Sequence, residues 1–214
     1  MPSRREFIQR GIAASVLAAC PLTSRLALAG SSSGKTYRLF KVVFDQTFAE
    51  GAAFGAEAVS RGAPARAVGS NAGSVWMNEI EPRWKRGPAV IAGLTGRASL
   101  FCLELLARDY GMGVVYRAEH SPTGDGGIRH VITGPESLSE WQAESKTRLT
   151  AAGQCWSAVA ARMVMNCPET LEPDPSIGLL DLAQPAGIAG PSLFSWVIAP
   201  AKRPGVLGER AKRG

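Results

Sequence analysis

Hydrophobic residues along this chain form two kinds of pattern, and the two kinds alternate. Short apolar runs rich in β-branched residues predict four strands, over 37–45, 65–68, 89–94 and 114–120. Between these runs, apolar residues recur every three or four positions, which predicts helices over 47–62, 74–87 and 97–111. Strands that alternate with helices favour a parallel sheet with helices on its faces.

The second half of the chain adds an edge strand, a helical segment and a tail. The run at 128–133 follows a turn-rich loop and predicts an antiparallel edge strand. Ser137 and Glu140 form a capping box, which predicts a helical segment that extends to about Asn166. Residues 168–214 are Pro- and Gly-rich without a clear period, so we expect a poorly ordered, basic tail. The predicted fold class is α/β: a three-layer, mostly parallel sheet of about four strands plus an antiparallel edge strand, followed by a C-terminal helical segment.

The first 29 residues have the composition of an export signal. Arg4 and Arg5 precede a short apolar run over 11–20, and Ala27 and Ala29 form a small-x-small cleavage site. Residues 3–8 read S-R-R-E-F-I, which resembles the S-R-R-x-F-L consensus of bacterial twin-arginine (Tat) signal peptides. The resemblance implies export of a folded protein to the periplasm, with the Tat translocase and a signal peptidase as partners. Ten apolar residues are too few to span a membrane, which takes about 20, so we expect no transmembrane segment.

A second interpretation of the signal involves Cys20. The stretch L-A-A-C at 17–20 resembles the lipobox of bacterial lipoproteins, in which the Cys is lipidated and becomes the first residue. Pro21 directly after it is unusual for a lipobox, and the small-x-small site further on is complete. We therefore favour cleavage after Ala29 and keep a lipid anchor on Cys20 as the alternative.

The stretch G-S-S-S-G-K-T at 30–36 is similar to a nucleotide-binding P-loop but departs from its pattern. The P-loop has four residues between its two glycines, whereas only three separate Gly30 from Gly34. A strand follows the stretch, where a P-loop requires a helix. We interpret it as a flexible linker. The predicted organisation is a signal peptide over 1–29, the linker over 30–36, a single α/β domain over 37–167 and the tail over 168–214.

Charge and cysteine content exclude two classes of protein. The net charge is +6, but residues 1–29 contribute +3 and residues 201–214 contribute +4, so the body of the chain is close to neutral. A nucleic-acid-binding domain needs an excess of basic residues on the folded part. No C-x-x-C pair is present, so zinc-ribbon and thioredoxin chemistry are unsupported. We expect Cys102 to be a small buried hydrophobic residue. We expect no disulfide between Cys155 and Cys167, because a helix between them would hold them about 18 Å apart.

The carboxyl ends of the predicted parallel strands are where a ligand is expected in such a sheet. The residues that follow the four strands are Asp45, Asn71, the trio Thr95, Gly96 and Arg97, and His120. In the trio, a hydroxyl, free helix N–H groups and a guanidinium would converge, which suits a carboxylate or phosphate. The alternative is that Asp45 and Thr95 only cap helices.

His120 and His130, the only histidines, flank the loop at 121–127 and can face each other across a hairpin. With Glu119 or Asp125 they could hold a metal, but hydrogen-bonded edge histidines are the commoner case, and we predict no metal. The stretch G-Q-C-W-S-A at 153–158 resembles the region around the nucleophile of papain-like cysteine proteases. That family places its His after the Cys, and no His follows Cys155. We therefore expect Cys155 and Trp156 to pack a helix.

Two functions remain open at this point. The first is an exported periplasmic binding or accessory domain for a small anionic ligand or a partner protein. The alternative is a periplasmic hydrolase that uses His120 with a Ser, Thr or Cys nucleophile. An enzyme needs a base within hydrogen-bond reach of a nucleophile, so the position of His120 relative to Ser70, Thr95 and Cys155 distinguishes the two. No dinucleotide-binding fingerprint and no nucleophile elbow is present.

Overall fold

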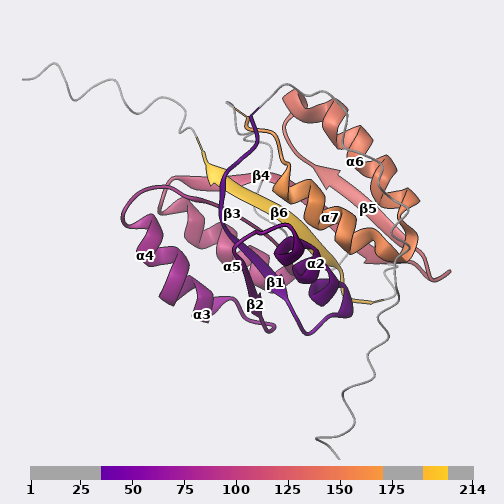
Figure 1. Ribbon diagram of the computed structural model, residues 1–214, viewed down its shortest axis with the longest axis horizontal. Coiled ribbons are helices and arrows are strands. Elements are labelled where there is room, and N and C mark those ends of the chain that lie inside the picture. The colour runs from indigo at the N-terminus through magenta and orange to yellow at the C-terminus, as the bar shows by residue number, and fades with distance from the viewer. Residues whose placement is uncertain (1–34, 171–189, 202–214) are drawn as a thin grey trace, which may run out of the picture. The chain divides into compact units, whose positions relative to one another are not determined.

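The computed structural model of the protein describes residues 35–170 and 190–201, and its centre is a mixed β-sheet (Figure 1). Six strands pair in the order β2-β1-β3-β6-β4-β5. Their bounds are β1 Leu39–Asp45, β2 Ala65–Val68, β3 Val90–Gly96, β4 Met112–Pro122, β5 Ile128–Thr133 and β6 Leu193–Pro200. The β2-β1 and β1-β3 pairs are parallel, and the β3-β6, β6-β4 and β4-β5 pairs are antiparallel. The predicted α/β class is confirmed.

The helices follow the predicted segments, with different ends. Their bounds are α2 Ala49–Ser60, α3 Gly73–Val75, α4 Glu81–Trp84, α5 Arg97–Arg108, α6 Ser139–Ala151 and α7 Trp156–Met165. A π-helical segment, η1 Trp76–Ile80, joins α3 to α4, and short 3-10 turns precede α6 (η2 Glu136–Leu138) and α7 (η3 Gly153–Cys155). The expected helix at 74–87 is therefore three consecutive helical segments. Its spaced apolar residues Trp76, Ile80 and Trp84 are all buried.

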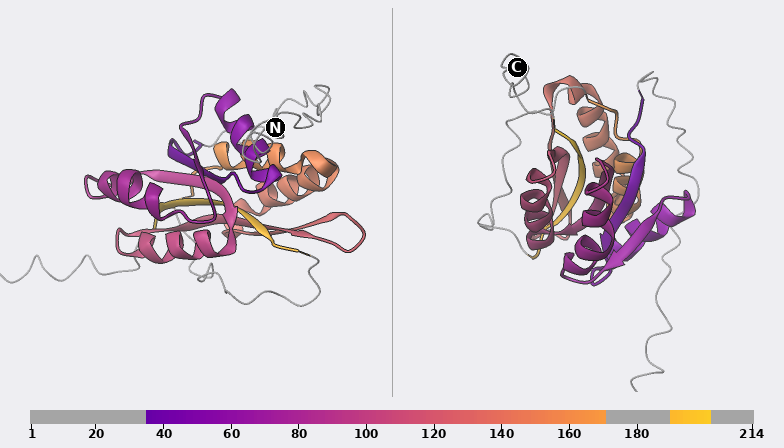
Figure 2. Two further views of the ribbon diagram at one scale, coloured as in Figure 1. Left: turned by 90° about the horizontal axis from the view of Figure 1, so that it is seen from below. Right: turned by 90° about the vertical axis from the view of Figure 1, so that its left-hand side faces the viewer.

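Helices pack on both faces of the sheet, and each face has its own hydrophobic cluster (Figure 2). The first face is covered by α2, α6 and α7, whose buried members include Phe54, Leu149 and Trp156. The second face is covered by α5 and the α3–α4 region, with Leu100 and Trp84 among the buried residues. In β6, alternate residues supply the two clusters, as the pleat of a strand requires.

Strand β6 was missed by the prediction of a tail over 168–214, although it lies in the interior of the sheet. Its residues from Leu193 to Ala199 are all buried, because helices cover both faces at this point. A strand buried on both faces is a continuous apolar run without alternation. The Pro- and Gly-rich segment before β6 concealed that signal. Because β6 enters antiparallel between β3 and β4, the sheet is mixed and not mostly parallel.

Two glycines allow the close packing around β1 and β3. A Cβ atom on Gly93 would lie 2.2 Å from the Val43 carbonyl oxygen and 2.7 Å from the Trp196 ring. A Cβ atom on Gly51 would lie 1.8 Å from the Asp45 carbonyl oxygen, so only glycine lets α2 approach the end of β1.

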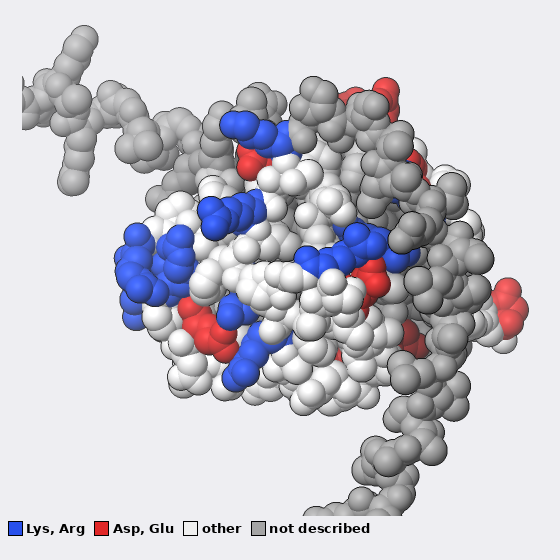
Figure 3. Space-filling view, viewed as in Figure 1, with Lys and Arg blue, Asp and Glu red and all other residues white. Residues whose placement is uncertain are grey.

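Several charged side chains on the surface form ion pairs. On the face seen in Figure 3, Lys and Arg gather over α4 and elsewhere occur in small groups beside acidic side chains. Glu79 forms ion pairs with Lys41 (2.7 Å) and with Arg66 (3.0 Å). Lys85 forms an ion pair with Glu81 at 3.0 Å. Along the part of the chain that the structure describes, no helix is both long and apolar enough to cross a membrane.

Candidate functional site

The two histidines meet on the first face of the sheet, as the hairpin interpretation predicted. His120 on β4 and His130 on β5 are direct cross-strand partners. Their Nδ1 atoms lie 2.7 Å apart, within hydrogen-bond distance, and both residues are buried. The Trp156 ring at the start of α7 covers His120, with centroids 4.3 Å apart and planes tilted by 32°. The imidazoles are therefore held between the sheet and α7.

On its other side, the His120 ring contacts Ser195 of β6, which lies in the core. The Nε2 atom of His120 lies 2.8 Å from Ser195 Oγ, and the Tyr116 hydroxyl lies 3.4 Å from the same oxygen. Tyr116 and Ser195 have no exposed surface, and His120 is only 2% exposed. We call Tyr116, Ser195, His120 and His130 the buried polar chain. Each of its members has a partner, which a buried polar group requires.

The direction of the hydrogen bonds in the buried polar chain decides its chemistry. Only one of the two Nδ1 atoms can carry the proton between the histidines. If His120 donates to His130, then Nε2 of His120 accepts the Ser195 hydroxyl, which is the geometry of a general base with its nucleophile. If His130 donates, then His120 donates from Nε2 to Ser195 and cannot act as its base.

The buried polar chain is uncharged at neutral pH. Burial lowers the pKa of His120 well below its ordinary value of 6.5, and the neighbouring His130 lowers it further. Burial also lowers the pKa of His130 to about 4. Burial raises the pKa of the Tyr116 phenol above its ordinary value of 10.0, so the phenol remains protonated. Both imidazoles are therefore neutral, and no member of the chain repels or attracts a ligand by net charge.

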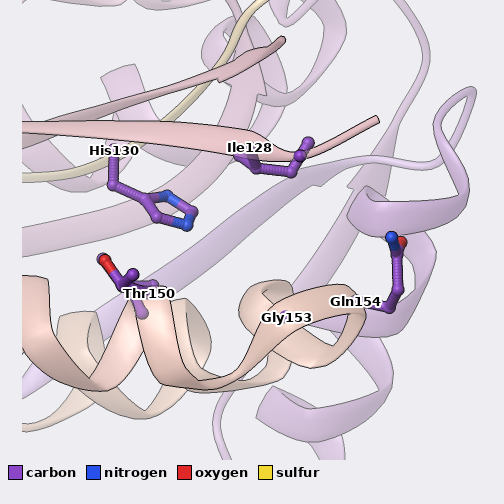
Figure 4. A pocket seen from close by; sticks show the side chains of 7 residues that line it. Ile128, His130, Thr150, Gly153 and Gln154 are labelled. Atoms are coloured by element: carbon purple, nitrogen blue, oxygen red, sulfur yellow. The ribbon is translucent and has the colours of Figure 1, made fainter. Parts of the chain in front are cut away.

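Two hollows of about 220 Å³ each flank the histidine pair. The His130 hollow lies between β5 and the end of α6, and Figure 4 shows the His130 side chain directed toward Thr150, with Gln154 at the far end. Its lining is Gly127, Ile128, His130, Leu149, Thr150, Gly153 and Gln154. The two hollows share Ile128.

The His120 hollow lies at the carboxyl ends of the parallel strands, where the sheet predicts a ligand. Its lining is Phe48, Glu50, His120, Pro122, Ile128, Trp156, Pro191 and Leu193. These residues come from the start of α2, the β4–β5 hairpin, the first residue of α7 and the start of β6. Aromatic and aliphatic side chains dominate the lining, with Glu50 as its only charged member among the described residues.

Asp45 and Asn71 have local structural roles. Asp45 Oδ1 accepts hydrogen bonds from the Thr47 amide at 3.0 Å and the Thr47 hydroxyl at 2.6 Å. Asn71 Oδ1 accepts the Gly73 amide at 2.6 Å. In both cases the side chain fixes the turn that leads from a strand into a helix. The alternative that Asp45 caps the helix is wrong, because the N-cap residue of α2 is Phe48 and no side chain caps this helix.

The predicted anion site at Thr95, Gly96 and Arg97 has a different geometry from the one expected. Strand β3 continues to Gly96, so Thr95 lies inside the strand, fully buried, and its hydroxyl accepts Trp196 Nε1 at 3.0 Å. The Arg97 guanidinium pairs with Glu119 at 3.1 Å and stacks on the Phe194 ring at 4.9 Å. The Thr95 hydroxyl is thus engaged and the Arg97 charge is balanced. Because Glu119 and His120 are adjacent in β4, the Arg97 pair lies on the opposite face from the histidines.

The hydroxyl beside His120 belongs to Ser195, and not to Ser70 or Thr95. The Ser70 carbonyl accepts the Ser99 hydroxyl at 3.0 Å. Sequence reasoning missed Ser195 because it lies in the segment predicted to be a tail. The available signal was a single polar residue within the apolar run L-F-S-W-V-I at 193–198.

The predictions for Trp156 and the cysteines have different outcomes. Trp156 is buried and packs against the core, as predicted, and Cys155 lies in the turn before α7. Cys102 and Cys167 are free, so the expected absence of a bridge between Cys155 and Cys167 is confirmed. The expectation that Cys102 is buried is wrong, because it lies on the exposed side of α5. Residues 1–34, including Arg4, Arg5, Ala27, Ala29 and Cys20, lie outside the described residues.

Comparison with protein-family models, with curated proteins and with solved structures found no match to this chain. Within residues 35–170 and 190–201, no three His, Cys, Asp or Glu side chains are grouped so that they could hold a metal. The candidate site therefore consists of the buried polar chain and the two hollows beside it.

Proposed function

We propose that this protein is an exported, periplasmic α/β binding domain that holds a small, largely apolar molecule in the His120 hollow. One observation supports this above all: a hollow of about 220 Å³ lies at the carboxyl ends of the strands, over the His120 and Trp156 rings. Ligand sites in α/β sheets occur at this edge, and they combine apolar walls with a few polar groups. Liquid water occupies about 30 Å³ per molecule, so the hollow suits a ligand of roughly monocyclic size.

This proposal changes the class of ligand expected from the sequence. A small anion was expected because of Arg97, but that guanidinium is balanced by Glu119. The His120 hollow contains a carboxylate and neutral imidazole, and no Lys or Arg is part of its described lining. A neutral or cationic molecule suits this environment better than a carboxylate or phosphate.

Binding is tested by a thermal-shift screen of small neutral aromatic and aliphatic compounds on the purified chain. A compound present at a hundred times its dissociation constant stabilises the folded state by about 2.7 kcal/mol. Phe48→Trp places a larger ring on the wall of the hollow and should weaken the shift. Phe40→Trp is the matched control, because Phe40 packs on the opposite face of the sheet. If both variants respond to the compound like the original chain, binding occurs elsewhere and the proposal fails.

Export is the second part of the proposal and depends on Arg4 and Arg5. Replacing both with Lys should retain the precursor in the cytoplasm, whereas an unchanged periplasmic yield would exclude the Tat route. Mass spectrometry of the mature N-terminus separates the two endings of the signal. Cleavage after Ala29 leaves Gly30 first, and lipidation leaves a modified Cys20 first.

A hydrolase is the second candidate, because Ser195 lies 2.8 Å from His120 Nε2 and His130 lies behind His120. A third group that orients the base is part of the arrangement that activates a serine nucleophile. Ser195, however, has no exposed surface, so a substrate reaches it only if the hollow opens further. Labelling by a fluorophosphonate, abolished by Ser195→Ala, would support the hydrolase. Absence of labelling at millimolar reagent would leave the binding function as the better account.

A further inference from the structure

The carboxylate of Glu50 borders the His120 hollow. Glu50 lies in the first turn of α2 and is half-buried. Among the described residues, no ion pair or hydrogen bond to its side chain is formed. Glu57, less than two turns further along α2, contrasts with it, because Glu57 binds both Arg61 and Arg162. A half-buried carboxylate beside an apolar hollow is available to a cationic group.

The walls of the hollow favour a cation as well. Phe48 and Trp156 both line the hollow, and aromatic rings attract a nearby cation. The one imidazole in the lining belongs to His120, which burial keeps neutral at pH 7. The described lining therefore contains one negative charge, two aromatic rings and no positive charge.

We propose that the natural ligand of the His120 hollow is a small organic amine, with its ammonium group at Glu50 and its apolar part between Phe48 and Trp156. This inference rests on the proposed function and adds the chemical class of the ligand. The carboxylate would hold the ammonium group, and the two rings would pack against the apolar part. A carboxylate-bearing ligand of the same shape would meet the Glu50 charge and be repelled.

The test uses three probes of nearly equal shape: benzylamine, benzyl alcohol and benzoate. At pH 7.5 and low salt, we expect benzylamine to bind the full chain about two- to fivefold more tightly than benzyl alcohol, with benzoate weakest. This range is that of a partly exposed charge pair, for which tenfold would correspond to 1.4 kcal/mol. Raising the NaCl concentration from 50 to 500 mM should reduce the preference for benzylamine, because salt screens the attraction between the ammonium group and the Glu50 carboxylate.

Glu50→Gln should abolish the preference, so that the variant binds benzylamine no more tightly than it binds benzyl alcohol. Glu140→Gln is the matched control, since Glu140 is also an acidic residue in the first turn of a helix, α6, but does not border the hollow. Its preference for benzylamine should remain.

The outcomes separate this inference from the function on which it rests. If benzyl alcohol and benzylamine bind equally, or if Glu50→Gln retains the preference, the amine assignment is overturned while a binding hollow remains. If none of the three probes binds at millimolar concentration, the amine assignment also falls. The screen of other apolar compounds then decides the function itself.

Discussion

Acid should destabilise this protein through its buried histidine pair. His130 is neutral in the folded state, because burial lowers its pKa to about 4, whereas an unfolded histidine has a pKa near 6.5. Below pH 6.5 the unfolded chain binds a proton that the folded chain does not, so the free energy of unfolding falls as the pH falls. The loss grows from about pH 6.5 down to about pH 4. His120 acts in the same direction.

The size of this effect follows from the shift of the His130 pKa. A shift from 6.5 to about 4 corresponds to at most about 3 kcal/mol. The ring borders a hollow that is open to water, and screening reduces the value to about 1–2 kcal/mol at pH 4.5. The chain has only two histidines, so in an untagged protein the histidine part of the proton linkage belongs to this pair.

Urea unfolding at pH 7.5 and pH 4.5 measures the effect, with His130→Asn as the comparison. Carboxylates contribute a background loss that is common to both proteins. The original chain should lose about 1–2 kcal/mol more than the variant between the two pH values. If the two proteins lose the same free energy, His130 titrates normally in the folded state, and the buried polar chain is open to water.

Three further perturbations test the packing around the site. Ser195→Ala leaves Nε2 of His120 and the Tyr116 hydroxyl without their buried partner, so we expect the free energy of unfolding, measured in urea, to fall by about 1–3 kcal/mol. An unchanged free energy would show that water replaces the hydroxyl. Gly93→Ala should lower the free energy of unfolding by more than about 2 kcal/mol, because the added Cβ would lie 2.2 Å from the Val43 carbonyl oxygen. Gly124→Ala is the control, because Gly124 has open space around it. Arg97→Ala should leave the thermal shift caused by a ligand of the His120 hollow unchanged, and a lost shift would place the ligand on the opposite face of the sheet.

The strands and helices of the first half of the chain were predictable because their patterns are local. β-branched runs and three-to-four spacing located β1 to β4 and α2 to α5, with differences of a few residues at the ends. Strand β6 could not be recognised in the same way. Its neighbours β3 and β4 are distant in sequence, and the segment before it resembles a tail.

The candidate site was predictable to the same limited extent. The hairpin placed His120 opposite His130, since cross-strand pairing follows from the short loop between them. Ser195 required the position of β6, which only tertiary structure supplies. Arg97 was misjudged for a related reason. Its partner Glu119 lies on a strand that is not adjacent to β3 in the sheet, so the pair cannot be inferred from spacing.

NMR of the histidine and tryptophan rings tests the central claim, a ligand in the His120 hollow, most directly. The chain has two histidines and five tryptophans, so the ring signals are few enough to assign. Titration with benzylamine should shift the His120 imidazole and the Trp156 indole saturably, while Trp76 and Trp84 on the opposite face remain unchanged. Unchanged His120 and Trp156 signals, or saturable shifts confined to Trp76 and Trp84, would contradict the account.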